Sequence, residues 1–173
     1  MGQYYRPYLK EEKTGNITIL NRTIDGEYTM AKLMEHSWWL NPFVNAVCNI
    51  LYKNPHQIAW VGDYADDFPH KNLVWDTDGE EIKKVDFLLD NKYIVNHTKK
   101  LYLNCTSYKE RNNNDGWIIH PLSLLTAVGN GQGGGDYRGV NSNSVGDWCM
   151  DVLSIEDTIP NGYTEEIYDF YED

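Results

Sequence analysis

Hairpin signals constrain the fold more than any other feature of the sequence. Residues 3–9 alternate loosely and are rich in aromatics, and a Thr-Gly-Asn turn separates them from a second strand at 17–20. Residues 92–95 and 100–104 are joined in the same way across a short polar turn. No strand–helix–strand rhythm is visible, so the sequence predicts a single α+β domain with a mainly antiparallel sheet.

One segment has a clear helical period. Asn41 is suited to the N-cap, Pro42 to the first helical position, and Asn54-Pro55 to a stop. Between them, the apolar residues fall on one face of a helix: Phe43, Val44, Val47, Ile50 and Leu51. Residues 29–36 also have some helical character, so we expect one or two helices.

The remaining segments give weaker signals. We predict a short buried strand at 57–61, an edge strand at 72–75 and a last strand at 148–155. Residues 80–89 fit either a helix or a strand, and residues 109–116 read as a polar loop.

The 173 residues suit one domain, which we place at 1–159, followed by an acidic tail at 160–173. The tail mixes tyrosine and phenylalanine with acids, so it is either partly disordered or docked through its aromatics. Because every periodic apolar segment precedes it, we expect truncation after Ile159 to leave the fold intact.

Charge and composition exclude several classes of protein. The net charge is −11, with 17 acidic and 15 basic residues in 1–138 but nine acidic and no basic residues in 139–173. A nearly neutral body without a basic run argues against binding of DNA or RNA. The three cysteines lack the spacing of a disulfide framework or a zinc site, and we expect no metal and no cofactor. Neither a secretory signal nor a membrane-spanning run is evident, so we expect a cytoplasmic protein without membrane contact.

The glycine-rich stretch at 129–139 is the strongest candidate site. Glycines allow close approach, and a run of free backbone N–H groups can cradle an anion. Arg138 would add a charged fork, whereas Asp136 would cap the loop or contact a hydroxyl group. The spacing is not that of a P-loop, and a tightly turned connector is the alternative. The candidate ligand-binding residues here are Gly131, Gly133, Gly134, Gly135, Asp136, Tyr137 and Arg138.

A second candidate motif follows the strand at 57–61. Asp63, Asp66 and Asp67 could bind a hard cation, cap turns or contact a ligand. Tyr64 and the more distant Trp148 are candidates for stacking on a ligand. A third motif, residues 35–39, places a histidine beside a serine, but for His36, and likewise for His120, a structural role is favoured over catalysis.

Several motifs together resemble a family of small, mostly uncharacterised bacterial and phage proteins. They are Met1-Gly2-Gln3-Tyr4-Tyr5, Gly62-Asp63-Tyr64-Ala65-Asp66 and Asn130-Gly131-Gln132-Gly133-Gly134-Gly135-Asp136. Family members often have arginine at the position of Gln132. In shorter members the glycine-rich motif precedes the Gly-Asp-Tyr-Ala-Asp motif, whereas here it follows. We therefore expect these two motifs to be adjacent in the fold. The resemblance implies a phage-encoded protein that interacts with its host.

Three functions remain open. The favoured hypothesis is a homo-oligomeric phage protein that sequesters a small anionic, nucleotide-derived immune signal between the 129–139 loop and nearby aromatics. The second is a metal-assisted phosphodiesterase or glycohydrolase that uses Asp63, Asp66 and Asp136 for the metal, with His36 or His120 as base. The third is an acidic protein that blocks a host protein through its tail.

Overall fold

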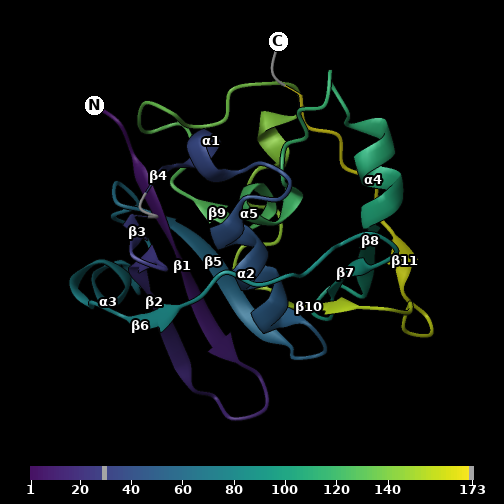
Figure 1. The fold of residues 1–173 in the computed structure, drawn as a ribbon, viewed down its shortest axis with the longest axis horizontal. Helices are drawn as coiled ribbons and strands as arrows, with labels where there is room; N and C mark the ends of the chain where they lie inside the picture. Colours follow the sequence, from purple (N-terminus) through teal and green to yellow (C-terminus); the bar gives the residue numbers. More distant parts are fainter. Residues whose placement is uncertain (29–30, 172–173) are drawn as a thin grey trace.

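The computed structural model describes residues 1–28 and 31–171 as one α+β domain. Its sheet is mostly antiparallel, and the two ends of the described chain lie at the same end of the molecule (Figure 1). The strand order along the sheet is β11 (Thr164–Glu165), β8 (Leu101–Asn104), β7 (Tyr93–Asn96), β10 (Val152–Glu156), β5 (His56–Gly62), β1 (Tyr4–Glu11), β2 (Ile17–Ile24) and β3 (Glu27–Tyr28). Three short strands pair off this path, namely β4 (Ala31–Lys32) with β1, β6 (Glu80–Ile82) with β2 and β9 (Ala127–Val128) with β5.

Strand β5 is buried on both faces because a core lies on each side of the sheet. Ile58 and Trp60 point into the larger core, whereas Ala59 and Val61 point into the smaller one. This alternation follows from the two-residue period of a strand. A strand with two buried faces needs a nearly continuous apolar sequence, as residues 57–61 have.

Four short helices contribute to the larger core. They are α1 (Leu33–His36), α2 (Pro42–Leu51), α4 (Cys105–Arg111) and α5 (Pro121–Thr126). Helix α2 lies in front of the sheet in Figure 1 and begins as predicted, because the Asn41 side chain accepts hydrogen bonds from the Phe43 and Val44 amides. No helix among residues 1–28 and 31–171 is long and apolar enough to cross a membrane.

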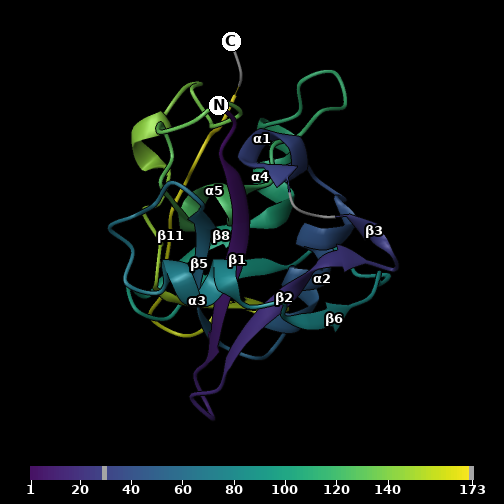
Figure 2. The same ribbon diagram turned by 90° about the vertical axis from the view of Figure 1, so that its left-hand side faces the viewer.

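Helix α3 (Lys71–Asp76) packs over the smaller core on the other face (Figure 2). The prediction of an edge strand at 72–75 is therefore wrong. The reason is Arg6, which is 3% exposed and donates hydrogen bonds to the carbonyls of Val74 at 2.6 Å and Thr77 at 3.0 Å. This long-range contact holds the segment as one helical turn, against its local strand propensity.

Other elements follow the sequence in part. Both predicted hairpins are confirmed as β1–β2 and β7–β8. The last strand is shorter than predicted, and 109–116 begins with the last residues of α4 rather than loop. Residues 80–89 form only the short strand β6 followed by irregular chain. The predicted helical character of 29–36 is observed at Leu33–His36, and residues 29–30 lie outside the described chain.

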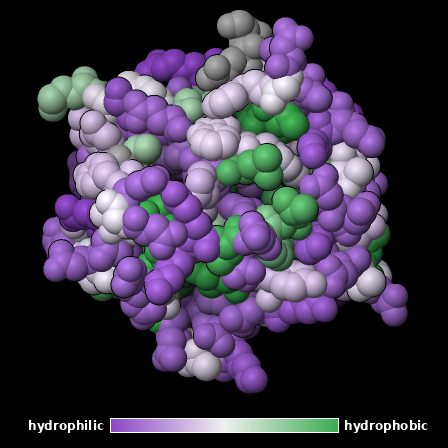
Figure 3. All heavy atoms as spheres, viewed as in Figure 1, coloured by the Kyte–Doolittle hydropathy of each residue, from purple (hydrophilic) through white to green (hydrophobic). Residues whose placement is uncertain are grey.

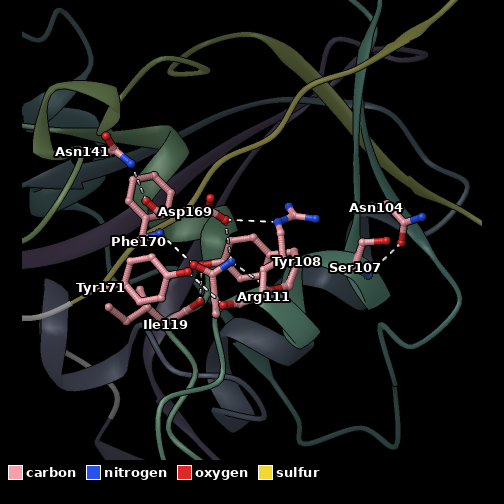
Figure 4. A network of polar contacts seen from close by, with 10 residues as sticks. Asn104, Ser107, Tyr108, Arg111, Ile119, Asn141, Asp169, Phe170 and Tyr171 are labelled. Atoms are coloured by element: carbon pink, nitrogen blue, oxygen red, sulfur yellow. Dashed lines mark hydrogen bonds and ion pairs between the residues drawn. The ribbon is translucent and has the colours of Figure 1, made fainter.

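Residues 160–171 are part of the domain rather than a free tail. Strand β11 pairs in parallel with β8, and Tyr168 and Phe170 are 9% and 1% exposed in the larger core. Figure 4 shows Arg111 of α4 (Cys105–Arg111) beside Asp169 of this segment. The Asn112 side-chain oxygen accepts a hydrogen bond of 2.9 Å from the Phe170 amide, and Arg111 forms an ion pair of 3.2 Å with Asp169. The segment is docked through its aromatics, one of the two alternatives that the sequence left open. This packing argues against the expectation that truncation after Ile159 leaves the fold intact, which stays a prediction.

Candidate functional site

Three motifs of the sequence meet at the side chain of Gln3, which is fully buried. Its amide nitrogen donates to the Gly129 carbonyl at 2.8 Å and to Asp136 Oδ2 at 2.9 Å. Its amide oxygen accepts from the Tyr64 backbone at 3.2 Å. The N-terminal, Gly-Asp-Tyr-Ala-Asp and glycine motifs are therefore neighbours, which confirms the predicted adjacency of the last two.

Asp136 closes the glycine loop from inside. Its Oδ2 accepts hydrogen bonds from the amides of Gly131 at 2.7 Å and Gly133 at 3.0 Å, and its Oδ1 accepts from the Tyr5 hydroxyl at 2.8 Å. The prediction that Asp136 caps the loop or contacts a hydroxyl group is confirmed. Burial first, and then the hydrogen bond and charge of Asp136, raise the pKa of Tyr5. The amides expected to cradle a ligand anion already hold a carboxylate of the chain itself.

The glycines of this loop serve close packing. A Cβ atom at Gly133 would lie 2.5 Å from Gln3 Cβ, and one at Gly135 would lie 2.4 Å from Lys32 Cδ. Gly134 differs, because it pairs with the N-terminal segment through its amide, which donates to the Met1 carbonyl at 2.9 Å. It does not have a positive φ, and a Cβ there would have no neighbour nearer than 3.5 Å. Neither a positive φ nor a close neighbour of a Cβ atom therefore requires glycine at Gly134.

Two predicted stacking residues are unavailable to a ligand. Tyr137 and Trp148 are 1% and 0% exposed, and they pack edge-on against Phe170 and Tyr168. Large aromatics fill this core because the C-terminal segment covers them. Arg138 is exposed and donates to the Gly133 carbonyl at 3.3 Å.

The aspartates of the second motif are dispersed. Asp63, half-buried, accepts a hydrogen bond from the Tyr4 amide at 3.0 Å, and Asp66 pairs with Lys71. Tyr64 is also half-buried, and Asp67 is exposed. Within the part of the chain that the structure describes, no group of three or more histidine, cysteine or acidic side chains could hold a metal ion.

A cavity of about 370 Å³ opens where α1, β3 and the start of α2 meet. Apolar side chains gather near the middle of this face of the molecule, with hydrophilic residues around them (Figure 3). The cavity walls include Tyr28, Ala31, His36, Trp38, Pro42 and Phe43. Cavities of roughly 300–1,000 Å³ with aromatic walls are the usual binding places for small molecules.

His36 is the buried polar group of this cavity, with 3% of its surface exposed. Its Nε2 accepts a hydrogen bond of 2.7 Å from the Trp60 indole. Its Nδ1 is buried and makes no hydrogen bond of normal geometry to any described residue. Burial lowers the pKa of His36 to about 4, and the nearby Ala31 carbonyl opposes part of that shift. The ring is therefore neutral at pH 7.

Behind His36 lies a second buried imidazole, His120, which does not line the cavity. Its Nδ1 caps α5 by accepting a hydrogen bond of 3.2 Å from the Leu122 amide, and its Nε2 lies 3.7 Å from Cys48 Sγ. Burial, and then the proximity of His36, lower the pKa of His120 to about 3. Both histidines thus have packed, hydrogen-bonded surroundings, as the sequence favoured.

The rim of the cavity is acidic. Glu27 and Glu35 belong to its lining, and each pairs with a lysine outside it, Lys84 at 3.1 Å and Lys32 at 3.7 Å. The start of α2 also reaches the cavity, but Asn41 already accepts its first amides and Pro42 has no N–H group. Among the described residues that line the cavity there is therefore no basic side chain and no free helix amide.

A second cavity, of about 400 Å³, lies beside His97, Glu12 and Val152. His97 Nε2 lies 2.7 Å from the Ser154 hydroxyl, and Nδ1 lies 3.0 Å from that of Tyr163. This resembles a serine–histidine pair, but Ser154 is 0% exposed and both ring nitrogens have partners. The cavity beside α1 and α2 is therefore the better candidate site.

Sequence reasoning did not find this cavity. It singled out the histidine of residues 35–39, but Tyr28, Trp38 and Phe43 reach the cavity from separate elements. Only the unusual clustering of polar and aromatic residues at 35–39 pointed toward it.

Comparison with protein-family models, curated protein sequences and solved structures gives no match. The family resemblance described above accordingly stays a prediction.

Proposed function

We propose that this protein binds a small molecule in the cavity beside α1 and α2, without transforming it. The observation that carries the proposal is a cavity of about 370 Å³ whose walls include the aromatic side chains of Tyr28, Trp38 and Phe43. Cavities of this size with aromatic walls are the usual binding places for small molecules.

The proposed ligand is a nucleotide-derived signal, as in the sequence-based hypothesis, but the proposed binding site is the cavity rather than the glycine loop. In the loop, Asp136 takes the amides of Gly131 and Gly133, and Tyr137 is enclosed. In the cavity, Tyr28, Trp38 and Phe43 offer aromatic surface to a flat ring. As part of the same proposal, a phage-encoded, homo-oligomeric protein would sequester the signal in the host cytoplasm.

A metal-assisted hydrolase has less support from the arrangement of side chains. Asp136 and Asp63 bond to the adjacent residues Tyr5 and Tyr4, whereas Asp66 pairs with Lys71. The three do not form a group that could hold a metal ion within the described residues. The low pKa of His36, about 4 because of burial, makes it a weak base at neutral pH.

The blocking of a host protein by a free acidic tail also has less support. Tyr168 and Phe170 are buried, so the segment is not free to dock elsewhere.

The test combines native mass spectrometry, after incubation with nucleotide extracts from bacteria, with calorimetry on any retained compound. Tyr28→Ala removes an exposed wall of the cavity, and Leu73→Ala on α3 is the matched control. We expect Tyr28→Ala to weaken binding by about tenfold, equivalent to about 1.4 kcal/mol. Leu73→Ala and Arg138→Ala should leave the affinity unchanged.

Two results would contradict the proposal. Loss of binding in Arg138→Ala with full binding in Tyr28→Ala would return the site to the glycine loop. A wild-type protein that retains no compound from any extract would favour an interaction protein instead.

A further inference from the structure

A further cavity, of about 380 Å³, lies where β1, β2 and β6 meet the later turns of α2 (Figure 2). This α2–β6 cavity shares no lining residue with the cavity beside α1 and α2, so an inference about it goes beyond the proposed function and does not depend on it. Its floor is apolar, because Leu20, Ala46 and Ile82 line it and are 3%, 2% and 8% exposed. Its walls are mostly polar.

His56 is the buried polar side chain of the α2–β6 cavity, with 4% of its surface exposed. Its Nδ1 lies 2.8 Å from the Asn54 carbonyl oxygen, which only accepts, so Nδ1 carries a proton. Nε2 makes no hydrogen bond to a described residue, and it is not one of the buried side-chain atoms without a partner. Nε2 is therefore open to solvent, and in the neutral ring it is a hydrogen-bond acceptor.

The geometry of the sheet directs His56 toward this cavity. Ile58 and Trp60 point into the larger core, so His56, two residues before Ile58 in β5, lies on the same face of the sheet. Helix α2 contributes to that core and lines the cavity with Asn49. Glu11 pairs directly with His56 across the two neighbouring strands, so their side chains are neighbours on this face.

The carboxylates of the α2–β6 cavity have no partner in the described chain. Glu11, Glu80 and Glu81 line the cavity, and none of them forms an ion pair or a side-chain hydrogen bond with a described residue. They face a single basic lining residue among those described, Lys83. The last turn of α2 carries no basic side chain, and the C-terminal end of a helix attracts positive charge. The charges here favour a cation.

We propose that the α2–β6 cavity binds an aliphatic diamine or polyamine, with its methylene chain on the apolar floor and its ammonium groups bonded to Glu11, Glu80 and His56 Nε2. An ammonium group has three N–H donors and no acceptor, which suits walls made of acceptors. The methylene chain packs on apolar surface as the stem of a lysine does. A metal ion fits less well, since the described residues include no group of three acidic, histidine or cysteine side chains that could hold one.

The first experiment compares putrescine with 1,4-butanediol by calorimetry at pH 8, where imidazoles are mostly neutral and aliphatic amines are charged. The two compounds have the same carbon chain, but the diol carries no charge. We expect putrescine to bind about tenfold or more tightly, and its affinity to fall as salt is added. Equal binding of the diol, or no saturable binding of putrescine, would overturn the inference.

Glu11→Gln separates the cavity from the net charge of the protein. The exposed Glu110→Gln on α4 removes the same charge elsewhere and is the matched control. We expect the affinity for putrescine to fall about tenfold or more in Glu11→Gln and to stay unchanged in Glu110→Gln. An equal loss in both variants would show that the diamine follows net charge, and the assigned site would be wrong.

Two substitutions test His56 itself. His56→Asn keeps a side-chain donor near the position of Nδ1 but has no atom at the position of Nε2, whereas His56→Gln places an amide there. We expect the asparagine variant to lose about tenfold in affinity for putrescine and the glutamine variant to retain most of it. Thermal unfolding of both variants distinguishes lost binding from lost folding. Wild-type affinity in a folded asparagine variant would overturn the role of His56.

The two proposed sites fail separately. Tyr28→Ala should leave the affinity for putrescine unchanged, and Glu11→Gln should leave the binding of any compound from the nucleotide extracts unchanged, because the two cavities share no lining residue. Loss of putrescine binding in a folded Tyr28→Ala variant would overturn the assignment to the α2–β6 cavity.

Discussion

Asp136 connects the N-terminal segment to the glycine-rich loop at 129–139. Its carboxylate accepts four hydrogen bonds, from Gln3, Tyr5, Gly131 and Gly133. The Asp136 side chain is 6% exposed, and a buried carboxyl group needs hydrogen-bond partners, which these four donors supply. Its removal would leave the Tyr5 hydroxyl and the Gly133 amide buried without this acceptor.

Substitutions of Asp136 should therefore reduce stability in a defined order. We expect Asp136→Asn to lower the free energy of unfolding by about 1.5–3 kcal/mol, because the charge-assisted bonds become neutral ones. Asp136→Ala should cost more, since all four donors lose their acceptor. Urea denaturation measures both, with the exposed Asp67→Asn as a control expected within about 0.5 kcal/mol of wild type. Equal stability of wild type and Asp136→Ala would contradict this account.

The buried histidines make stability depend on pH. The folded-state pKa values of His36 and His120 are about 4 and about 3, below the ordinary value of 6.5. Below pH 6.5 the unfolded chain binds protons that the folded chain does not, so stability is greatest above pH 6.5 and falls as the pH is lowered. Each ring contributes a slope of up to about 1.4 kcal/mol per pH unit.

Urea denaturation between pH 7.5 and 5 tests this dependence in a range where most carboxylates stay ionised. His36→Gln should reduce the slope by up to about 1.4 kcal/mol per pH unit, because one of the two rings no longer titrates. An unchanged slope in this variant would show that His36 does not resist protonation in the folded state.

At the scale of elements, segment length decides what the sequence reveals. Both hairpins and α2 are long enough to show their period or their end signals, and all three were predicted. Helices α3, α4 and α5 have six or seven residues, too few for a 3.6-residue period to be recognised. The candidate cavity was missed for a related reason, because Tyr28, Trp38 and Phe43 meet only through tertiary packing.

The 129–139 loop was recognised as unusual, but its role depends on neighbours that the sequence does not show. We expect Gly133→Ala to destabilise the protein by about 1–3 kcal/mol, since the new Cβ would lie 2.5 Å from Gln3 Cβ. Gly134→Ala should stay within about 0.5 kcal/mol of wild type, because its Cβ has room. Thermal unfolding of the two variants provides a matched comparison, and an equal loss in both would point to backbone conformation rather than packing.

At the scale of the whole molecule, the larger core draws on nearly the full length of the described chain. Tyr5 of the first strand and Phe170 of the C-terminal segment belong to the same buried cluster. Gly139 lets that segment approach, because a Cβ there would lie 1.8 Å from the Tyr171 carbonyl. The C-terminal segment therefore completes the larger core.

Substitution of one aromatic residue in the C-terminal segment tests its contribution to the core without shortening the chain. We expect Phe170→Ala to lower the free energy of unfolding by about 3–5 kcal/mol, as for other buried phenylalanines. Ile167→Ala, in the same segment but 61% exposed, should change it by less than about 0.5 kcal/mol. Truncation after Ile159 should have at least the effect of Phe170→Ala. A truncated protein with wild-type stability would show that residues 160–173 do not contribute to the stability of the fold.

The position of Phe170 also bears on how the protein is made. A ribosome synthesises strand β1 before the C-terminal segment, yet the buried cluster that contains Tyr5 also contains Phe170 and is incomplete until residue 170 has been translated. The nascent chain consequently exposes apolar surface throughout elongation, and folding is completed only after most of the sequence has left the exit tunnel. Any premature stop codon before residue 170 would release a chain whose core cannot close, which makes such products substrates for chaperones and proteases.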